Sequence, residues 1–313
     1  FSLLRTIGKG SFGRVILVHH KKLDKFFALK VLNKEKLVRG NQVNHTINER
    51  NILYACDHPN IIRFFGSFKD SSYVYFVMKL YCNGDLYSLM KSKKSFDESQ
   101  ARFYAANVFL ALEYLHINNV LYRDLKPENV LLSANGYLKL TDFGFAKRVK
   151  SNQLTKTMCG TPDYLSPEVL SEIPYSKSVD WWSFGVFVYE LNTGKPPFSG
   201  SNQKELYAAI LRGEFLIPKT FSSNLTNMCK RLIEKKVSKR LGCSTRRQSD
   251  EVRDHKWFLN QVDWAALSTQ QVVAPFVPKT VDPLDIAFKK PRSAEEPLKI
   301  ARTDRYHDTF IDF

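Results

Sequence analysis

The feature that most constrains the fold of this chain is a change of hydrophobic patterning near residues 79–83. Before it, four segments alternate or run apolar as strands do, and one segment among them has the pattern of a helix. The expected strands are Phe1–Ile7, Arg14–His19, Phe26–Leu32 and Tyr73–Met78, and the expected helix is Gln42–Tyr54. Residues 1–80 therefore predict a small, β-rich lobe.

The pattern becomes helical after Asn83-Gly84. Ser99–His116 places its apolar side chains at helical spacing. Asp180–Asn192 is apolar nearly all round, as a buried helix is, and Gly194 lies just past its end. We expect a larger helical lobe over residues 81–258, joined to the first lobe by a hinge at residues 79–83, in an α+β fold.

From about residue 259 the chain loses its periodicity. Five prolines favour extended backbone in this part: Pro275, Pro278, Pro283, Pro291 and Pro297. The sequence nevertheless ends in Phe310-Ile311-Asp312-Phe313, and two aromatic side chains indicate a docked segment rather than a solvated linker. We predict that residues 259–313 form a tail with a docked end.

The composition is that of a globular protein, with 43% hydrophobic and 25% charged residues. No apolar run reaches the roughly 18 residues of a membrane helix, so we expect no transmembrane segment. The chain opens on Phe1 inside an expected strand, and we expect it to be a fragment of a longer protein. The five cysteines are scattered without a C-x-x-C pair, which favours a reducing compartment over a disulfide scaffold or a zinc site.

The net charge of +16, from 47 Lys and Arg against 31 Asp and Glu, would suit a nucleic acid or an anionic membrane as partner. The basic residues are, however, spread along the chain rather than gathered in one block. No recognised binding motif accompanies the charge. We therefore expect no nucleic-acid partner.

Residues Gly8–Val15, GKGSFGRV, contain the spacing G-x-G-x-x-G. This spacing is weak evidence alone, because dinucleotide-binding folds use it between a strand and a helix. Here a strand follows the glycines. That order favours a hairpin whose backbone amides approach phosphate groups closely, since glycine has no side chain.

Lys30 lies among the apolar residues of F-A-L-K, and burying its charge without a partner would be costly. We expect it to contact the α- and β-phosphates of a nucleotide and to pair with Glu49 on the following helix. An exposed lysine at the end of a strand is the alternative.

Tyr122–Asn129, YRDLKPEN, and the later D-F-G that begins at Asp142 carry the main chemical signal. Phosphoryl transfer asks a protein mainly to align the nucleophile and to neutralise charge. Asp124 can accept a hydrogen bond from an attacking hydroxyl, and Lys126 can meet the charge on the γ-phosphate. The oxygens of Asn129 and Asp142 are the hard ligands that Mg²⁺ prefers, so we predict a magnesium site there.

In this order and spacing, the motifs from Gly8 to Trp257 resemble the eukaryotic protein-kinase signature set. RDLKPEN together with G-T-P at 160–162 resembles the serine/threonine branch. Tyr122 before Arg-Asp, DFGFAKRV at 142–149 and the terminal F-x-x-F resemble the AGC group, and within it the catalytic subunit of cAMP-dependent protein kinase. The resemblance implies a bilobal protein-kinase fold with a small N-lobe, a helical C-lobe and a tail at 259–313 that wraps back to the N-lobe. It also implies transfer of the ATP γ-phosphate, with Mg²⁺, to serine or threonine.

The resemblance implies a fuller set of site residues. The expected catalytic residues are Asp124, Lys126, Lys30 and Glu49. The residues expected at ATP and its metal are Gly8, Lys9, Gly10, Ser11, Phe12, Gly13, Val15, Ala28, Lys30, Met78, Lys79, Tyr81, Asp85, Glu128, Asn129, Leu131, Thr141 and Asp142, with Asn129 and Asp142 as metal ligands. In the tail, Phe310 and Phe313 are expected to pack beside the helix that bears Glu49.

The segment between D-F-G and S-P-E at 166–168 matches the activation segment of such kinases. Thr157 matches their phosphothreonine, and a phosphate there would gather basic partners. We expect these partners to be Arg123, Lys147 and His45. Thr155 is the alternative phosphate acceptor, and an unmodified solvated loop remains open.

Relatives in this family prefer arginines upstream of the target serine. Here the expected substrate contacts are Glu128, Asp85, Asp163 and Thr161. The family's second acidic contact is expected within Y-A-A at 207–209, where this chain has alanine. We therefore predict that basic peptides are preferred, but less sharply than by the relatives.

The tail departs from the family in two places. Ala301 stands where relatives carry a phosphorylatable serine, so we predict no phosphorylation at that position. The acidic stretch with its adenine-contacting aromatic is replaced by DIAFKK at 285–290. Whether Phe288 reaches the nucleotide is left open.

Two alternatives to a cAMP-dependent-kinase-like enzyme remain, namely the catalytic domain of a cGMP-dependent kinase and a non-catalytic kinase-fold scaffold. The scaffold is disfavoured because Lys30, Asp124, Asn129 and Asp142 are all present. The expected partners are basic Ser/Thr protein substrates and, by resemblance, a cyclic-nucleotide-binding regulatory subunit. The expected location is the cytoplasm, with the nucleus as a further compartment.

Overall fold

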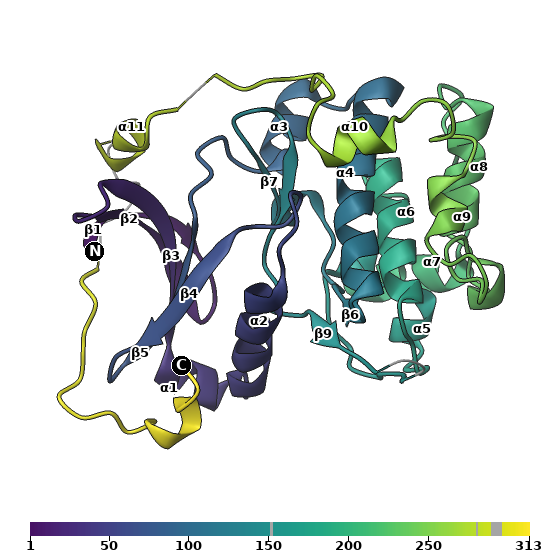
Figure 1. Cartoon of the computed structure of the whole chain (residues 1–313). Coiled ribbons are helices and arrows are strands. Elements are labelled where there is room, and N and C mark those ends of the chain that lie inside the picture. Colours follow the sequence, from purple (N-terminus) through teal and green to yellow (C-terminus); the bar gives the residue numbers. More distant parts are fainter. Residues whose placement is uncertain (151–152, 280, 289–295) are drawn as a thin grey trace. The chain divides into compact units, whose positions relative to one another are not determined.

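The computed structural model describes residues 1–150, 153–279, 281–288 and 296–313 (Figure 1). The chain divides into two compact units. The first comprises Phe1–His58, Ile62–Asn83 and Pro278–Phe313, and the second comprises Pro59–Ile61 and Gly84–Val277. The expected tail is thus divided, because residues 259–277 belong to the second unit and residues 278–313 to the first.

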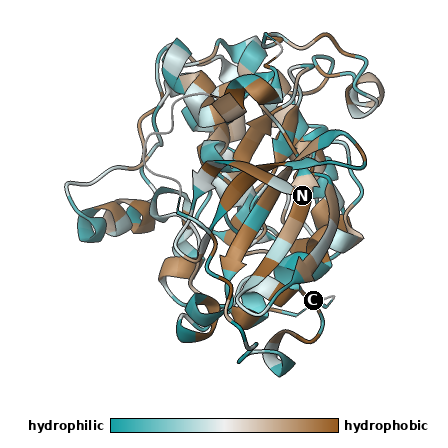
Figure 2. Ribbon diagram, turned by 90° about the vertical axis from the view of Figure 1, so that its left-hand side faces the viewer, coloured by the Kyte–Doolittle hydropathy of each residue, from teal (hydrophilic) through white to brown (hydrophobic). Residues whose placement is uncertain are grey.

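An antiparallel five-stranded sheet in the order β1-β2-β3-β5-β4 forms the centre of the first unit. Its strands are β1 (Ser2–Lys9), β2 (Gly13–His20), β3 (Lys25–Asn33), β4 (Phe64–Lys69) and β5 (Tyr73–Lys79). The helices of this unit are α1 (Lys34–Arg39), α2 (Val43–Ala55) and α11 (Pro283–Phe288), with a 3₁₀ turn at Asp308–Phe310. Figure 2 shows that the sheet strands are rich in hydrophobic residues.

Alternation along the strands sorts side chains between the two faces of this sheet. On one face Ile16, Leu29, Val31 and Val77 belong to a single buried cluster. Lys30 lies between Leu29 and Val31, and its side chain therefore points to the other face. This register sets the surroundings of the predicted phosphate-binding lysine.

The tail departs from the predicted extended structure at Pro283, which is the first residue of α11. Proline is tolerated in the first turn of a helix because the missing N–H would have no partner there. The expectation of extended backbone was therefore wrong for residues 283–288. Pro291 lies outside the described residues.

The second unit is mainly helical. Its helices are α3 (Leu86–Lys93), α4 (Glu98–Ile117), α5 (Pro167–Leu170), α6 (Ser178–Thr193), α7 (Gln203–Arg212), α8 (Ser223–Leu232), α9 (Asp250–Arg253) and α10 (Trp264–Ser268). Two short antiparallel pairs join β6 (Val120–Leu121) to β9 (Lys147–Arg148) and β7 (Val130–Leu132) to β8 (Leu138–Leu140). Three 3₁₀ turns lie at Pro127–Asn129, Pro162–Tyr164 and Val237–Lys239.

Helices α4 and α6 form the core of this unit. The Asp97 side chain accepts a hydrogen bond from the Gln100 amide and so caps the start of α4. Helix α6 is buried along almost its whole length, and Gly194 ends it in a left-handed conformation at φ 75°. Among the described residues, no helix combines the length and the hydropathy that crossing a membrane requires.

Candidate active site

The side chain of Asp124 is held by three donors in the second unit. The Thr161 hydroxyl donates to Oδ1 at 2.7 Å, and the Asn129 amide and the Lys126 ammonium donate to Oδ2 at 2.7 and 3.0 Å. Lys126 also donates to the Thr161 hydroxyl at 2.7 Å. Asp124 is buried. These contacts bring together four predicted residues and fix the orientation of the Asp124 carboxylate.

The segment before Asp124 is fixed by Asp180 at the start of α6. The Asp180 carboxylate accepts from the backbone amides of Tyr122 and Arg123 at 2.9 and 2.8 Å, and the His116 ring lies 2.8 Å from the same carboxylate. Arg123 has a positive φ of 69°, which is uncommon for a residue with a side chain. The buried helix thus supports an unfavourable backbone conformation beside Asp124.

The β7–β8 hairpin places Asn129 and Asp142 at neighbouring strand ends. Val130 pairs with Leu140, and the Thr141 amide donates to the Asn129 carbonyl at 2.9 Å. The side-chain amide of Asn129 uses its nitrogen to bond Asp124, both at Oδ2 and at the backbone carbonyl, 2.9 Å away. Its side-chain oxygen is thereby turned away from Asp124. An amide oxygen and a carboxylate at one strand end fit a hard divalent cation such as Mg²⁺.

In the first unit, the Lys30 ammonium lies 2.6 Å from the Glu49 carboxylate. Glu49 is buried on α2, and the Lys30 side chain is about one-fifth exposed. The charge-assisted bond satisfies the buried carboxylate and leaves the lysine partly accessible. The ion pair predicted from the sequence is therefore formed.

The three glycines between β1 and β2 differ in what the fold requires of them. A Cβ at Gly13 would lie 1.9 Å from the Val31 carbonyl oxygen, so close strand pairing requires glycine there. A Cβ at Gly8 or Gly10 would meet no protein atom closer than 3.7 or 3.9 Å. Packing within the first unit does not explain these two glycines. Glycine at these positions therefore suits a close approach of the backbone to a ligand.

Other predicted nucleotide contacts take varied positions. Ala28 and Met78 are buried and pair between β3 and β5. Phe12 packs against a cluster that contains Leu32, Leu37 and Val74. Near the β1–β2 hairpin, Lys9 and Ser11 are exposed and Val15 pairs with Gly8. After β5, the Lys79 ammonium lies over the Tyr81 ring. Asp85 caps α3, and Leu131 lies in β7.

Comparison with known proteins identifies the family of the chain. Residues 1–258 match the protein kinase domain family. The chain belongs to the protein kinase family. The match confirms the predicted bilobal α+β kinase fold.

Two curated relatives illustrate the likeness of this kinase domain. It is 48% identical over 278 residues to cAMP-dependent protein kinase type 3 of Saccharomyces cerevisiae, covering 89% of this chain and 69% of the relative. It is 42% identical over 309 residues to cAMP-dependent protein kinase catalytic subunit 2 of Drosophila melanogaster, covering 98% of this chain and 86% of the relative. These matches confirm the prediction of a serine/threonine protein kinase similar to cAMP-dependent catalytic subunits.

A fungal relative shows that such proteins also have longer chains. The kinase domain is 43% identical to the cAMP-dependent protein kinase catalytic subunit of Arthrobotrys oligospora over the whole of this chain, and it spans 60% of that relative's length.

The activation segment of the kinase brings Thr157 near two predicted cationic partners. The Tyr175 hydroxyl donates to the Thr157 carbonyl at 2.5 Å and accepts from Arg123 at 3.1 Å. Lys147 donates to the Thr155 hydroxyl at 2.9 Å, which lies 3.4 Å from the Thr157 hydroxyl. Thr157 is exposed whereas Thr155 is buried, which favours Thr157 as the phosphate acceptor. The third predicted partner, His45, lies in α2 of the first unit.

Burial and neighbouring negative charge raise the pKa of one carboxylate that the sequence analysis did not select. The Glu190 carboxylate is buried in α6 and accepts from the Tyr164 hydroxyl. Burial is the main cause that raises the pKa of Glu190, the charges of Glu128 and Asp163 add to it, and the hydrogen bond from Tyr164 opposes it, so that the pKa reaches about 7. Glu128, Asp163 and Glu190 are called the acidic cluster below. The missed signal was a glutamate within an otherwise apolar helix, where a charge is costly.

The tail end of the first unit docks through both apolar and polar contacts. Phe310 is fully buried in a cluster with Leu32, Leu37 and Val74, and Phe313 stacks on Phe76 with ring centroids 5.8 Å apart. Phe288 is 82% exposed.

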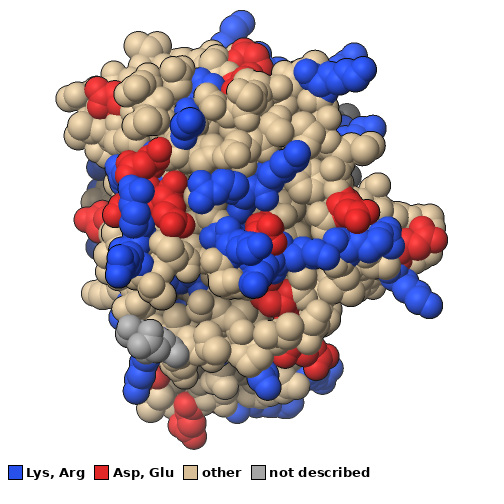
Figure 3. Space-filling model, turned by 90° about the vertical axis from the view of Figure 1, so that its right-hand side faces the viewer, with Lys and Arg blue, Asp and Glu red and all other residues tan. Residues whose placement is uncertain are grey.

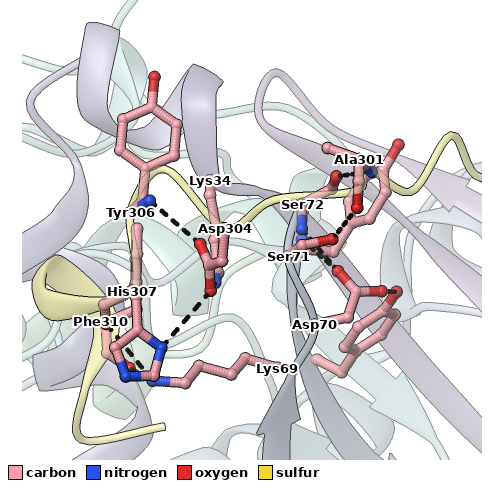
Figure 4. A network of polar contacts seen from close by, with 12 residues as sticks. Lys34, Lys69, Asp70, Ser71, Ser72, Ala301, Asp304, Tyr306, His307 and Phe310 are labelled. Carbon is pink, nitrogen blue, oxygen red and sulfur yellow. Dashed lines mark hydrogen bonds and ion pairs between the residues drawn. The ribbon is translucent and has the colours of Figure 1, made fainter.

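Polar contacts hold the backbone of the same segment (Figure 4). The Lys69 ammonium donates to the Phe310 carbonyl at 2.6 Å. The Ala301 amide donates to the Ser72 hydroxyl at 2.7 Å, and the Ser71 hydroxyl donates to the Ala301 carbonyl at 2.5 Å. These bonds hold backbone at Ala301 without any contribution from its side chain.

Proposed function

We propose that this serine/threonine kinase domain transfers the ATP γ-phosphate to serine or threonine hydroxyls in basic peptides. The observation that supports this most is the fixed Asp124 carboxylate. Its orientation is set by Thr161, Asn129 and Lys126, so it can accept a hydrogen bond from a substrate hydroxyl without first reorganising. Lys126 lies where a cation can also meet charge that develops on the transferred phosphate.

We further propose that Mg²⁺ and ATP are the cofactors of this site. Asn129 and Asp142 would hold the metal through oxygen, and bound Mg²⁺ would neutralise phosphate charge. Glycine at positions 8 and 10, which packing within the protein does not require, fits backbone contact with phosphates. Lys30, oriented by Glu49, would bind the phosphates by charge.

The acidic cluster supports the preference for basic substrates. Glu190 is buried beside two further carboxylates, so its ionised form is unfavourable unless a cation compensates. An arginine of the substrate would supply that cation and could bind a carboxylate in a bidentate manner. The sequence analysis predicted a weaker preference for basic peptides because the segment 207–209 has alanine in place of an acidic residue. Glu190 provides an acidic contact that this prediction did not include.

We also propose how the kinase is regulated and where it is located. A phosphate on Thr157 would bind Arg123 and Lys147, whose side chains lie near this threonine. Because Arg123 is next to Asp124 in the sequence, this bond would also act on the segment that carries Asp124. The relatives named as cAMP-dependent kinases support a cyclic-nucleotide-binding regulatory subunit as partner. The five cysteines are scattered along the sequence without a C-x-x-C pair, which supports the cytoplasm, with the nucleus as a further location.

The test is phosphate transfer from ATP and Mg²⁺ to an Arg-Arg-x-Ser peptide, with the Thr157-phosphorylated protein. We expect turnover on the order of 1–100 per second, lost in Asp142→Ala while the circular dichroism spectrum stays unchanged. A peptide with glutamine in place of both arginines should show a higher KM. Absence of transfer to a broad peptide set by the phosphorylated protein would favour the scaffold alternative.

A further inference from the structure

The end of α8 and the segment after it carry an excess of positive charge that the proposed function does not use. Residues 230–239 contain five exposed cationic side chains and a single carboxylate, that of Glu234. The five cations, called the basic patch, are Lys230, Arg231, Lys235, Lys236 and Lys239. Figure 3 views the side of the molecule on which α7, α8 and α9 lie, where Lys and Arg side chains form a band with carboxylates at its borders.

A closed loop holds the basic patch in place. The Leu241 amide donates to the Arg231 carbonyl at 2.9 Å, which brings the two ends of the segment together. Inside the loop, the buried Arg240 donates to the Glu234 carbonyl at 2.8 Å and binds both carboxylate oxygens of Glu168 at 2.6 and 3.0 Å. The backbone that carries these cations is therefore anchored to α5 rather than loosely tethered.

The cations of the basic patch differ from basic residues around them. Arg240, Arg247 and Arg253 each form an ion pair with a carboxylate. Among the described residues, no carboxylate forms an ion pair with any of the five patch cations. Nearby, burial lowers the pKa of His255, and the charges of Arg231 and Lys256 add to this effect, so that the pKa is about 4. The cations of the patch thus contribute to a positive local potential.

The chemistry of the segment favours one class of anionic partner. Residues 230–249 contain no aromatic side chain on which a nucleic-acid base could stack. Val237, at 37%, is the one large hydrophobic side chain among residues 230–249 that is exposed, so the segment has little to insert into a bilayer. A short acidic stretch of protein needs neither feature, because carboxylates pair with flexible lysines one by one.

We propose that the basic patch is a second docking surface for an acidic stretch in the protein substrates of this kinase. The proposal rests on the proposed function. Such substrates carry a basic motif that binds the acidic cluster and an acidic stretch that binds the basic patch. The two surfaces together therefore favour substrates in which these two segments are separate. Arg240 anchors the segment that carries the patch to Glu168, in the same unit as the acidic cluster.

The test uses two peptides with the same Arg-Arg-x-Ser motif and a flexible Gly/Ser linker of about twenty residues, which spans on average about 25 Å. One peptide ends in a run of glutamates and the other in an equal run of glutamines. We expect the glutamate peptide to have about fivefold lower KM at low salt with the same kcat. The difference should disappear in about 0.5 M salt.

Matched variants locate the effect on the chain. Lys235→Gln, Lys236→Gln and Lys239→Gln combined should abolish the difference between the peptides and leave turnover of the glutamine peptide unchanged. The control combines Lys21→Gln, Lys22→Gln and Lys25→Gln, three exposed lysines of the first unit, and changes the net charge equally. It should retain the difference.

Each other outcome overturns the proposal in a distinct way. Equal KM values for the two peptides, or an equal loss in both triple variants, would show that no specific docking occurs at the patch. If phosphatidylserine vesicles or duplex DNA bind the protein through the patch while the glutamate run has no effect, the partner class is wrong. If neither peptide is phosphorylated, the proposed function fails and not the patch alone.

Discussion

The ammonium group of Lys34 lies 2.6 Å from the carboxylate of Asp304, although 270 positions separate the two residues in the sequence. The Lys34 side chain is fully buried and the Asp304 side chain is 19% exposed. The Lys34 ammonium also lies 5.7 Å from the centre of the Phe310 ring. A buried cation at the start of α1 thus depends on the tail for its counter-charge.

Removing Asp304 alone should therefore destabilise the protein more than removing the whole pair. We expect Asp304→Ala to lower the free energy of unfolding by about 3 kcal/mol, because it leaves a buried charge unpaired. Adding Lys34→Met should restore part of this loss. Chemical denaturation measures both changes. Asp308→Ala, at an exposed carboxylate of the same tail segment, is the control and should cost less than about 0.5 kcal/mol.

The two contacts of the Thr161 hydroxyl predict a defect in kcat. Thr161→Val keeps a similar shape but removes the hydroxyl that donates to Asp124 and accepts from Lys126. A hydrogen bond to a charged group is worth about 1.5–3 kcal/mol, so kcat should fall about 10- to 100-fold. Thr161→Ser should retain most of the activity. Steady-state kinetics in which Thr161→Val left kcat unchanged would show that orientation of Asp124 does not limit transfer.

Two alanine substitutions in the glycine-rich hairpin are predicted to affect different properties, one the stability and the other the binding of ATP. Gly13→Ala should lower the melting temperature, because the new Cβ would overlap the Val31 carbonyl. Gly10→Ala meets no such contact, so it should leave the melting temperature unchanged and raise the KM for ATP. Thermal unfolding and ATP titration separate the two. An unchanged KM in Gly10→Ala would argue against close backbone approach to phosphate at that position.

The raised pKa of Glu190 predicts that the KM for arginine-containing peptides depends on pH. Below about pH 7 Glu190 is protonated in the free protein, so the KM should rise as the pH falls through this value. Glu190→Gln should remove this step while keeping the hydrogen-bonding shape. Because folding raises the pKa, the folded protein binds the proton more tightly, and the resulting stabilisation is present at low pH and lost as the pH rises toward 7. A peptide without arginines, which should show no step, is the control.

Much of the fold followed from local patterns. The strands at β1, β2, β3 and β5 and the helix α6 were predicted because alternation and uniform burial are properties of short segments. Strand β4 and helices α1 and α11 were not predicted. At Pro283 the same residue type that breaks a helix interior begins a helix, and local sequence does not distinguish these positions.

The sequence by itself determined the family, because Y-R-D-L-K-P-E-N and D-F-G combine residue type, order and spacing that phosphoryl transfer requires. Only the tertiary structure decided which distant groups satisfy one another's charge and burial. It placed Lys34 against Asp304, and it buried Glu190 beside Glu128 and Asp163. The physical reason is that the cost of a charge depends on its neighbours and on its access to water, and both arise only when separate elements pack together.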